Sequence, residues 1–250
     1  MIDLAGQVAL VSGGSRGVGR AVALRLASAG ADVALTYHSR RADADAVASE
    51  VRALGRRALV AGGDHADTTF AAELVARVQA ELGGLDHFIA NAGIWPVAET
   101  ALVAIAPARL RATMSANLDA VYVTTRAALA VLRPGGSVVL VSSTAAQRGE
   151  AFHADYAATK GALIALTKSL AIECAPLLRV NCVAPGWIDT EMSASAFEGE
   201  GRARIVRSIP LQRIASADDV AAPILFLCSA LARHITGEVL NVNGGSVLSG

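Results

Sequence analysis

The sequence has no excess of charge of either sign. Its 250 residues include 22 lysines and arginines and 22 aspartates and glutamates, so the formal net charge is zero. Nucleic-acid binding needs a surplus of basic side chains to neutralise phosphates, and intrinsic disorder needs low hydrophobicity together with high net charge. Because 53% of the residues are hydrophobic and only 18% are charged, we expect a folded protein that does not bind nucleic acid.

Cysteines and long apolar runs are also scarce. The three cysteines, Cys174, Cys182 and Cys228, lack the spacing of metal ligands, and an odd number argues against a disulfide framework. We expect them to be small buried hydrophobes in a reducing compartment, and we expect no metal site. No stretch approaches the ~20 apolar residues of a membrane span, and the N-terminus shows no signal peptide. The sequence thus predicts a soluble, cytoplasmic protein that does not act in a membrane.

Short apolar runs alternate with longer segments of helical period along most of the chain. Runs without polar alternation are typical of parallel strands, which are buried on both faces. Repeated strand-then-helix units predict an α/β fold, a doubly wound parallel sheet with helices on both faces. No proline-rich or charged linker interrupts the pattern, so we expect residues 1–250 to form one domain. The expected strands are 8–12, 32–37, 58–61, 87–90, 137–142, 180–184 and 238–242.

The least patterned segment is 191–213, which follows the sixth expected strand and is rich in serine, glycine and arginine. In an open α/β sheet, ligands bind beyond the carboxyl ends of the strands. A polar, glycine-containing insertion at that place favours a substrate lid. The alternative is an ordinary surface loop.

The first expected strand ends in a glycine-rich turn that leads into an apolar helix. Gly13, Gly17 and Gly19 permit a tight turn whose backbone approaches a pyrophosphate at the positive N-terminus of the helix. Such a cluster also fits a simple turn. Its position between the first strand and the first helix favours a dinucleotide site.

The end of the second expected strand bears on the choice of coenzyme. No carboxylate follows Tyr37, although an acidic residue there would bind the adenosine ribose and repel a 2′-phosphate. Arg16, Arg40 and Arg41 are expected to converge without a competing acid, which suits a 2′-phosphate. Alternatively, Arg40 and Arg41 are only the solvated start of a helix. We therefore expect NADP(H) rather than NAD(H).

Three further residues suggest acid–base chemistry. Tyr156 and Lys160 are one turn apart at the start of a helical segment, so they share a face. A tyrosine with a pKa near 10 exchanges protons poorly at neutral pH unless a cation stabilises its phenolate, and Lys160 could supply that charge. Ser143 follows the fifth expected strand, where its hydroxyl could face the same place.

Together these motifs resemble the short-chain dehydrogenase/reductase family in its single-domain form, over essentially the whole chain. The glycine turn is similar to the family's nucleotide turn, with Ser12 where threonine is usual. Residues 90–93 resemble the family's Asn-Asn-Ala-Gly, with Ala90 in place of its first asparagine. The resemblance implies a Rossmann-type fold and an NAD(P)-dependent oxidoreductase with a catalytic set formed by Ser143, Tyr156, Lys160 and Asn117.

The resemblance also implies a role for each site residue. Tyr156 would donate a proton to a carbonyl, and Ser143 would hydrogen-bond the same oxygen. Lys160 would lower the tyrosine pKa and bind the nicotinamide ribose, and Asn117 would position Lys160 and a water. Asp64 would meet the adenine, and residues 185–190 would hold the carboxamide. The implied coenzyme contacts are Gly13, Ser15, Arg16, Gly17, Val18, Gly19, Tyr37, His38, Ser39, Arg40, Asp64, His65, Asn91, Ala92, Gly93, Tyr156, Lys160, Pro185, Gly186, Ile188 and Thr190.

The sequence contains few aromatic residues, and several of them fall near the expected substrate pocket. Aromatics make up 4% of the chain, yet both tryptophans follow strands that border the site. The expected substrate contacts are Ser143, Trp95, His153, Tyr156 and Trp187, with Ile94, Ala145, Phe152, Met192 and Phe197 as further pocket residues. An apolar pocket suits a hydrophobic or aromatic ketone. For His153, an exposed loop histidine is an equal alternative.

Two other functions stay open. The chain is similar to 3-oxoacyl-thioester reductases, whose carrier-protein users have basic residues where this chain has Pro134 and Leu177, with Arg133 and Arg179 nearby. An acidic carrier needs a positive docking surface, so we expect a free small ketone or secondary alcohol rather than a carrier-bound or CoA thioester. A catalytically idle NADP(H) sensor would be expected to lack part of the catalytic set. The charge-poor helices and the resemblance of the last strand imply a homotetramer, with a homodimer as the alternative.

Overall fold

The computed structural model describes residues 2–248. Within that range, seven parallel strands form one sheet in the order β3-β2-β1-β4-β5-β6-β7. This confirms the predicted Rossmann-type, doubly wound sheet. The order reverses between β1 and β4, which opens a crevice at the carboxyl ends of these strands. The strands are β1 (Val8–Val11), β2 (Asp32–Tyr37), β3 (Ala58–Gly62), β4 (Leu85–Ala90), β5 (Leu132–Val141), β6 (Arg179–Pro185) and β7 (Val239–Val242).

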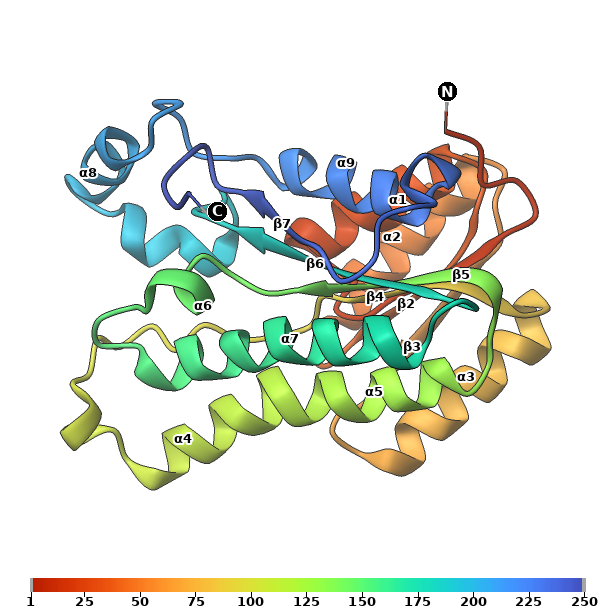
Figure 1. Ribbon diagram of the computed structural model, residues 1–250, viewed down its shortest axis with the longest axis horizontal. Coiled ribbons are helices and arrows are strands. Elements are labelled where there is room, and N and C mark those ends of the chain that lie inside the picture. The colour runs from red at the N-terminus through yellow and green to blue at the C-terminus, as the bar shows by residue number, and fades with distance from the viewer. Residues whose placement is uncertain (1, 249–250) are drawn as a thin grey trace.

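Helices cover both faces of the sheet (Figure 1). On one face lie α1 (Gly17–Ser28), α2 (Arg41–Ala53) and α9 (Ala217–Cys228), and on the other lie α3 (Thr68–Leu82), α5 (Ala120–Leu129) and α7 (Ala154–Glu173). Each face packs its own apolar cluster against these helices.

The side chains of β1 show why its sequence is apolar without alternation. Ala9 and Val11 pack into the cluster beneath α1 and α9, whereas Val8 and Leu10 pack into the cluster beneath α3 and α7. Successive side chains of a strand point to opposite faces. Since both faces of this strand are covered, all four residues are buried.

One strand begins earlier than its sequence indicates. β5 begins at Leu132, five residues before the expected start, and Leu132 pairs with Leu85 of β4. The sequence does not indicate a strand here, because it contains Pro134, Gly135 and Gly136, and proline and glycine are typical of turns. The register of β4 and β5 shifts between Leu85 and His87, as expected for an irregular strand start.

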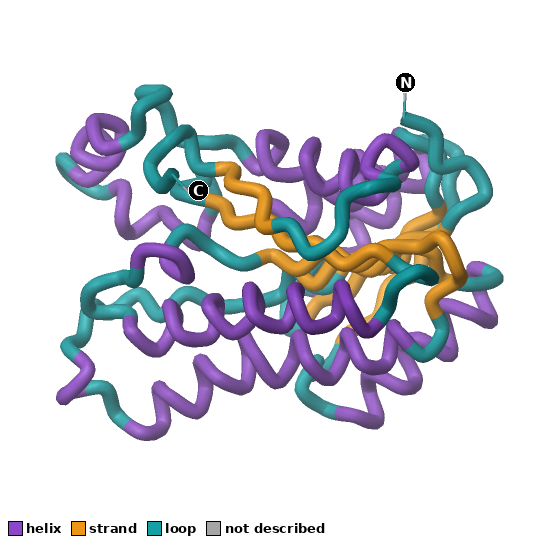
Figure 2. The backbone as a smooth tube through the Cα atoms, viewed as in Figure 1, coloured by secondary structure: helices purple, strands orange, loops and turns teal. Residues whose placement is uncertain are grey.

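A long helical rod follows β4 on the way to β5 (Figure 2). It comprises α4 (Pro107–Met114), a π-helical turn (Ser115–Asp119) and α5, which continue directly into one another. Single π turns occur mainly at functional sites, and this one contains Asn117.

The segment 191–213 is folded rather than an irregular loop. It contains a 3₁₀ helix (Glu191–Phe197) and α8 (Gly201–Ser208). Figure 1 shows α8 at the same end of the molecule as α6 (Ala145–Arg148), the short helix that follows β5. The remaining 3₁₀ turns among the described residues are Leu102–Ala104 and Ala230–Ala232.

The three cysteines are free thiols. Cys182 and Cys228 are buried as predicted, but Cys174 near the end of α7 is only partly buried. Across residues 2–248, none of the helices has the length and apolar character needed to cross a membrane.

Candidate active site

A cleft of about 1170 Å³ opens at the carboxyl ends of the strands. It is lined by the turns after β1 to β6, by the first turns of α7 and by the start of the segment 191–213. Each residue expected to contact the coenzyme lines this cleft, as do Ser143, Trp95 and Trp187. The volume exceeds that of a typical drug-sized site, which leaves room for a dinucleotide and a small substrate together.

The turn after β1 is joined to the end of β4 by hydrogen bonds. The Ser12 hydroxyl oxygen accepts from the backbone N–H groups of Asn91 and Ala92, both at 3.0 Å. The Asn91 amide in turn donates to the carbonyl oxygens of Ser12 and Gly13, at 3.1 and 3.2 Å. The serine that replaces the usual threonine therefore holds the two sides of the crevice together.

The glycines of this turn leave space for a pyrophosphate. Gly13 has a φ of +65°, a left-handed conformation that glycine adopts readily. A Cβ atom on Gly19 would overlap the carbonyl oxygen of Gly13. Helix α1 begins at Gly17, and within the described residues no side chain caps its N-terminus. Its first N–H groups can thus bind an anion, so the residues present fit a dinucleotide coenzyme.

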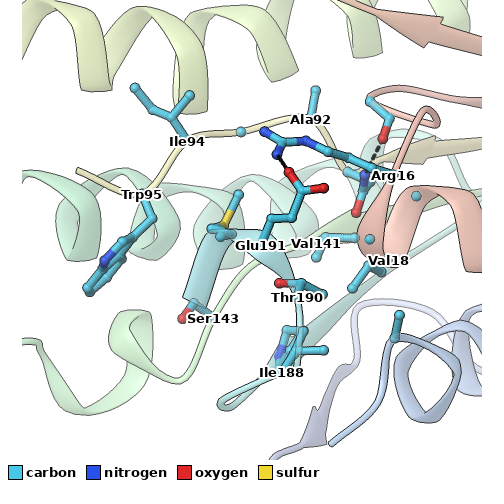
Figure 3. Close-up of a pocket in the computed structure, with 18 of the residues that line it drawn as sticks. Arg16, Val18, Ala92, Ile94, Trp95, Val141, Ser143, Ile188, Thr190 and Glu191 are labelled. Atoms are coloured by element: carbon cyan, nitrogen blue, oxygen red, sulfur yellow. Dashed lines mark hydrogen bonds and ion pairs between the residues drawn. The ribbon is translucent and has the colours of Figure 1, made fainter. Parts of the chain in front are cut away.

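The predicted arginine cluster is smaller than expected and contains an acid. Arg16 pairs with the Glu191 carboxylate (Figure 3). Arg40 pairs with the same carboxylate at 3.3 Å. Arg41 instead pairs with Asp45 at 3.5 Å, lies outside the cleft lining and is 78% exposed, because it already belongs to α2. The expectation that three guanidiniums converge is therefore wrong, because Arg41 lies outside the cleft. The expectation that no acid competes for them is also wrong, because Glu191 pairs with the other two.

The turn after β3, where the adenine is expected, forms another part of the cleft lining. Asp64 accepts a hydrogen bond from the N–H of Ala66 at 2.9 Å, which shapes this turn. The neighbouring His65 is buried, and its carbonyl accepts from the Thr124 hydroxyl at 3.3 Å. Burial lowers the pKa of His65 to about 4, so its imidazole is neutral at physiological pH.

Tyr156 and Lys160 lie in the first two turns of α7 and face the cleft. The Lys160 ammonium donates to the carbonyl of Val141 at 2.8 Å and lies 5.8 Å from the Tyr156 ring centroid. The backbone of Lys160 is held as well, since its carbonyl accepts from the Ser142 hydroxyl at 2.7 Å. Ser143, the next residue after Ser142, is close enough to Tyr156 to influence its pKa, and its hydroxyl accepts from the N–H of Ala145 at 3.1 Å. The end of β5 thus fixes all three catalytic candidates.

Burial dominates the ionisation of this group. It raises the pKa of Tyr156 to about 12, with the Ser143 hydroxyl opposing and the Glu150 carboxylate adding to the rise. Burial also lowers the pKa of Lys160 to about 8. The pKa of Tyr156 is therefore raised rather than lowered as expected, because burial disfavours the phenolate more strongly than the Ser143 hydroxyl favours it. Tyr156 is held as the neutral phenol, the form that can donate a proton.

Asn117 lies beneath the cleft rather than in its lining. Its side-chain oxygen accepts from the N–H of Ile94 at 2.7 Å, and its NH₂ group donates to the Ile94 carbonyl at 3.0 Å. The NH₂ group also donates to the Thr159 hydroxyl at 3.4 Å. Among the described residues it makes no hydrogen bond to Lys160, although both side chains pack against Gly93. In this structure Asn117 positions the backbone that leads to Trp95.

The start of α7 is anchored by a buried ion pair that the sequence analysis missed. Arg109 of α4 contacts the Asp155 carboxylate at 2.9 and 3.2 Å, and the Thr113 hydroxyl donates to it at 3.0 Å. Burial would raise the pKa of Asp155, but the hydrogen bonds from Arg109 and other groups lower it overall. This pair fixes the residue before Tyr156, and no local pattern connects positions so far apart.

A row of aromatic rings extends from Tyr156 to the segment 191–213. Trp95 meets Tyr156 edge-to-face with centroids 4.7 Å apart, and Trp187 lies 6.3 Å from Trp95. Phe197 packs against Trp187 at 6.0 Å. The two tryptophans give the cleft an apolar wall beside Tyr156, with Ile94, Ala145 and Met192 also in the lining.

His153 is neither of the two kinds of residue expected. It is buried rather than an exposed loop residue, yet it does not line the cleft. Its ring stacks on Trp95 with centroids 4.0 Å apart and planes at 19°. The predicted substrate contact is therefore not supported, because His153 supports the indole instead of facing the cleft. Phe152 and Phe197 also lie outside the lining.

Comparison with known proteins identifies the family. A family model described as enoyl-(acyl carrier protein) reductase matches residues 13–247. A crystal structure of a short-chain dehydrogenase from Burkholderia cenocepacia J2315 in complex with NADP superimposes with a TM-score of 0.91 at 39% identity, covering 97% of this chain and 98% of that one. The chain belongs to the short-chain dehydrogenase/reductase family. This family comprises oxidoreductases that act on CH–OH and C=O groups and bind NAD(P).

Two curated members illustrate the range of substrates among relatives of this short-chain dehydrogenase/reductase. A cyclohexanol dehydrogenase from Rhodococcus sp. (strain TK6) is 36% identical, with 99% of this chain and 98% of the relative covered. A 3-oxoacyl-[acyl-carrier-protein] reductase from Staphylococcus aureus (strain Mu50 / ATCC 700699) is 35% identical, with 95% and 96% covered. Their similar identities do not distinguish the two substrate classes.

Proposed function

We propose that this short-chain dehydrogenase/reductase interconverts a small apolar ketone and its secondary alcohol with NADP(H). The observation that carries the proposal is the position of Tyr156. It is a neutral phenol that lines the cleft together with Ser143 and lies directly beside the apolar ring of Trp95. A proton donor beside an apolar wall suits a carbonyl whose substituents are hydrocarbon.

Each residue of the site has a different role in ketone reduction. Tyr156 donates its phenolic proton to the carbonyl oxygen, and the Ser143 hydroxyl donates a hydrogen bond to that oxygen as negative charge develops on it. The Lys160 ammonium, 5.8 Å from the phenol ring, stabilises the phenolate left behind. When bound, the nicotinamide supplies the hydride that reaches the carbonyl carbon. In alcohol oxidation the same residues act in reverse.

The preference for NADP(H) rests on the two arginines that line the adenosine end of the cleft. Arg16 and Arg40 converge on one carboxylate, so their guanidiniums can reach the same anionic group. A 2′-phosphate offers several oxygens to such donors. The described turn after β2, residues 38–40, contains no acid that would repel it. The similar structure from B. cenocepacia is described as an NADP complex.

A free ketone is favoured over a carrier-bound thioester because the two arginines that could bind an acidic carrier, Arg133 and Arg179, already have partners within the chain. Arg133 contacts the carbonyl of Gly83 and pairs with Asp86 at 3.3 Å. Arg179 is half-buried and donates to backbone carbonyls at the end of α9. Both lie at the amino ends of β5 and β6, at the opposite edge of the sheet from Ser143. Neither offers an acidic carrier a free cation beside the cleft.

We also infer a homotetramer of single catalytic domains, each closed by the segment 191–213 as a substrate lid. Large apolar side chains on α5 and α7 remain exposed in the isolated chain, with Tyr122 at 56% and Ile172 at 81%. Contacts between subunits would cover such side chains. Light scattering should give four times the mass of the chain, and the mass of a single chain would contradict this inference.

A coenzyme-coupled absorbance assay tests the function directly. Cyclohexanone and acetophenone are compared with a 3-oxoacyl thioester on a purified acyl carrier protein, each with NADPH and with NADH. We expect a higher kcat/KM for the free ketones and for NADPH. Saturation by the carrier substrate at low micromolar concentration would favour the thioester reductase. Tight NADPH binding without turnover of any ketone, alcohol or thioester would favour the idle sensor.

A further inference from the structure

Glu191 connects the lid with the arginines of the proposed 2′-phosphate site. Its carboxylate pairs with Arg16 from the turn after β1 and, at 3.3 Å, with Arg40 from the turn after β2. Glu191 itself is the first residue of the 3₁₀ helix in the segment 191–197, which follows β6. All three residues line the cleft, and Figure 3 shows the Glu191 carboxylate directed at the Arg16 guanidinium. The ion pairs therefore span the coenzyme cleft.

We propose that Glu191 is a coenzyme-specificity residue whose carboxylate competes with the 2′-phosphate of NADP(H) for Arg16 and Arg40. The proposal rests on the proposed use of NADP(H). An acidic residue after β2 would disfavour a 2′-phosphate, and this chain has none there. Glu191 has the same effect, but it belongs to the segment that follows β6, on the other side of the cleft. Because it is attached to the lid, its displacement also releases the lid from the adenosine end of the site.

The chemistry of the two anions decides the competition. The carboxylate carries one negative charge, whereas a phosphate monoester carries about −1.5 to −2 and has three strong acceptor oxygens. The side chains of Arg16, Arg40 and Glu191 are 46%, 52% and 63% exposed. Ion pairs this exposed stabilise a structure only weakly. The 2′-phosphate therefore displaces Glu191, while NAD(H), which has a hydroxyl at this position, leaves the pairs in place.

The lid has a direct reason to respond to this displacement. Within residues 2–248, the hydrogen bonds and ion pairs that join the segment 191–197 to the turns after β1 and β2 are those of Glu191. The preceding residue, Thr190, lies against the glycine turn, where a Cβ on Gly17 would be 3.5 Å from its methyl group. Loss of the Glu191 pairs thus frees the start of the 3₁₀ helix while Thr190 stays near the coenzyme.

Calorimetric titration with half-coenzymes tests the competition without catalysis. The probes are adenosine 2′,5′-bisphosphate, which carries the 2′-phosphate, and 5′-AMP, which lacks it. Glu191→Gln should tighten binding of the bisphosphate about 5- to 20-fold and change binding of 5′-AMP less than about twofold. The matched control is Glu198→Gln, which removes the same charge from an exposed lid residue outside the cleft lining. It should change neither affinity by more than about twofold.

Hydrogen exchange gives an independent readout of the lid. In the unmodified protein, the bisphosphate should increase amide exchange in the segment 191–197, and 5′-AMP should not. In Glu191→Gln, exchange in this segment should already be raised without ligand. The proposal would be overturned if Glu191→Gln and Glu198→Gln changed the affinities equally, or if Glu191→Gln tightened the binding of both nucleotides equally. It would also be overturned if the bisphosphate did not change amide exchange in the segment 191–197.

Arg40→Ala separates this inference from the proposed coenzyme preference. If Arg40→Ala weakens bisphosphate binding while Glu191→Gln leaves it unchanged, the NADP(H) preference stands and the role of Glu191 is refuted. If Arg16→Ala and Arg40→Ala both leave bisphosphate binding unchanged, the preference itself is wrong, and the role of Glu191 is overturned with it.

Discussion

Trp95 meets the ring of Tyr156 edge-to-face, with centroids 4.7 Å apart and planes at 80°. The same indole stacks on the buried ring of His153, and the backbone before it is held by the Asn117 amide through Ile94. The indole is therefore fixed by two rings and by its own backbone. A rigid apolar wall beside the proposed proton donor would restrict how the proposed ketone substrate approaches the tyrosine hydroxyl.

Replacing Trp95 should impair substrate binding and spare coenzyme binding. Trp95→Ala removes the apolar wall, so we expect KM for a cyclic ketone to rise at least about 10-fold. The dissociation constant of NADPH, measured by fluorescence, should change less than about twofold. Trp95→Phe retains an aromatic ring and should show a smaller rise in KM. An unchanged KM for Trp95→Ala would place the substrate elsewhere.

Removal of the phenolic hydroxyl tests the proton donor. Tyr156→Phe should lower kcat by roughly 10²- to 10⁴-fold, because general acid catalysis is lost while the ring and its packing remain. NADPH binding should be retained. Tyr122→Phe removes the same hydroxyl from an exposed position on α5 and is the matched control. Near-normal turnover of Tyr156→Phe in steady-state assays would refute the assignment.

The two arginines of the cleft should affect the two coenzymes unequally. We expect Arg16→Ala and Arg40→Ala to raise KM for NADPH roughly 10- to 100-fold, since each removes a guanidinium from a phosphate. KM for NADH should change less than about threefold. Arg41→Ala, whose side chain pairs with Asp45 outside the cleft, should leave both constants unchanged. Equal losses with NADPH and NADH would show that the arginines do not contact the 2′-phosphate.

Buried histidines should make the fold sensitive to mild acid. Burial lowers the pKa of His87 to about 4, and the imidazole is held between Ser137 at 2.9 Å and Gln7 at 2.5 Å. In the unfolded chain the pKa is near 6.5, so between pH 6.5 and 4 the unfolded state binds more protons. The free energy of unfolding therefore falls as pH falls through this range. His87 contributes a loss of about 2 kcal/mol at pH 5.

Urea unfolding at pH 7 and pH 5 measures this effect. His87→Gln should reduce the loss of stability between the two pH values, because glutamine does not titrate. The exposed His234 provides the control, and His234→Gln should leave the pH dependence as it is. If His87→Gln lost as much stability on acidification as the unmodified chain, the buried imidazole would not be the cause.

The parallel sheet and the edge of it where the cleft lies could both be predicted from the amino-acid sequence. Apolar runs at strand length and helical period in between are local signals, and parallel strands necessarily bring their carboxyl ends to one edge. Local spacing also placed Tyr156 and Lys160 on one helix face. The turn that begins at Gly13 was recognisable because its conformation needs glycine.

Which charges and rings face one another could not be predicted in this way and is known from the folded structure. It turned Arg41 out of the cleft, brought Glu191 from a point 151 residues away to Arg40, and placed His153 behind Trp95 rather than in the cleft. It also raised the pKa of Tyr156 instead of lowering it. These outcomes depend on contacts between distant segments and on the water that packing excludes, and neither is encoded in the spacing of neighbouring residues.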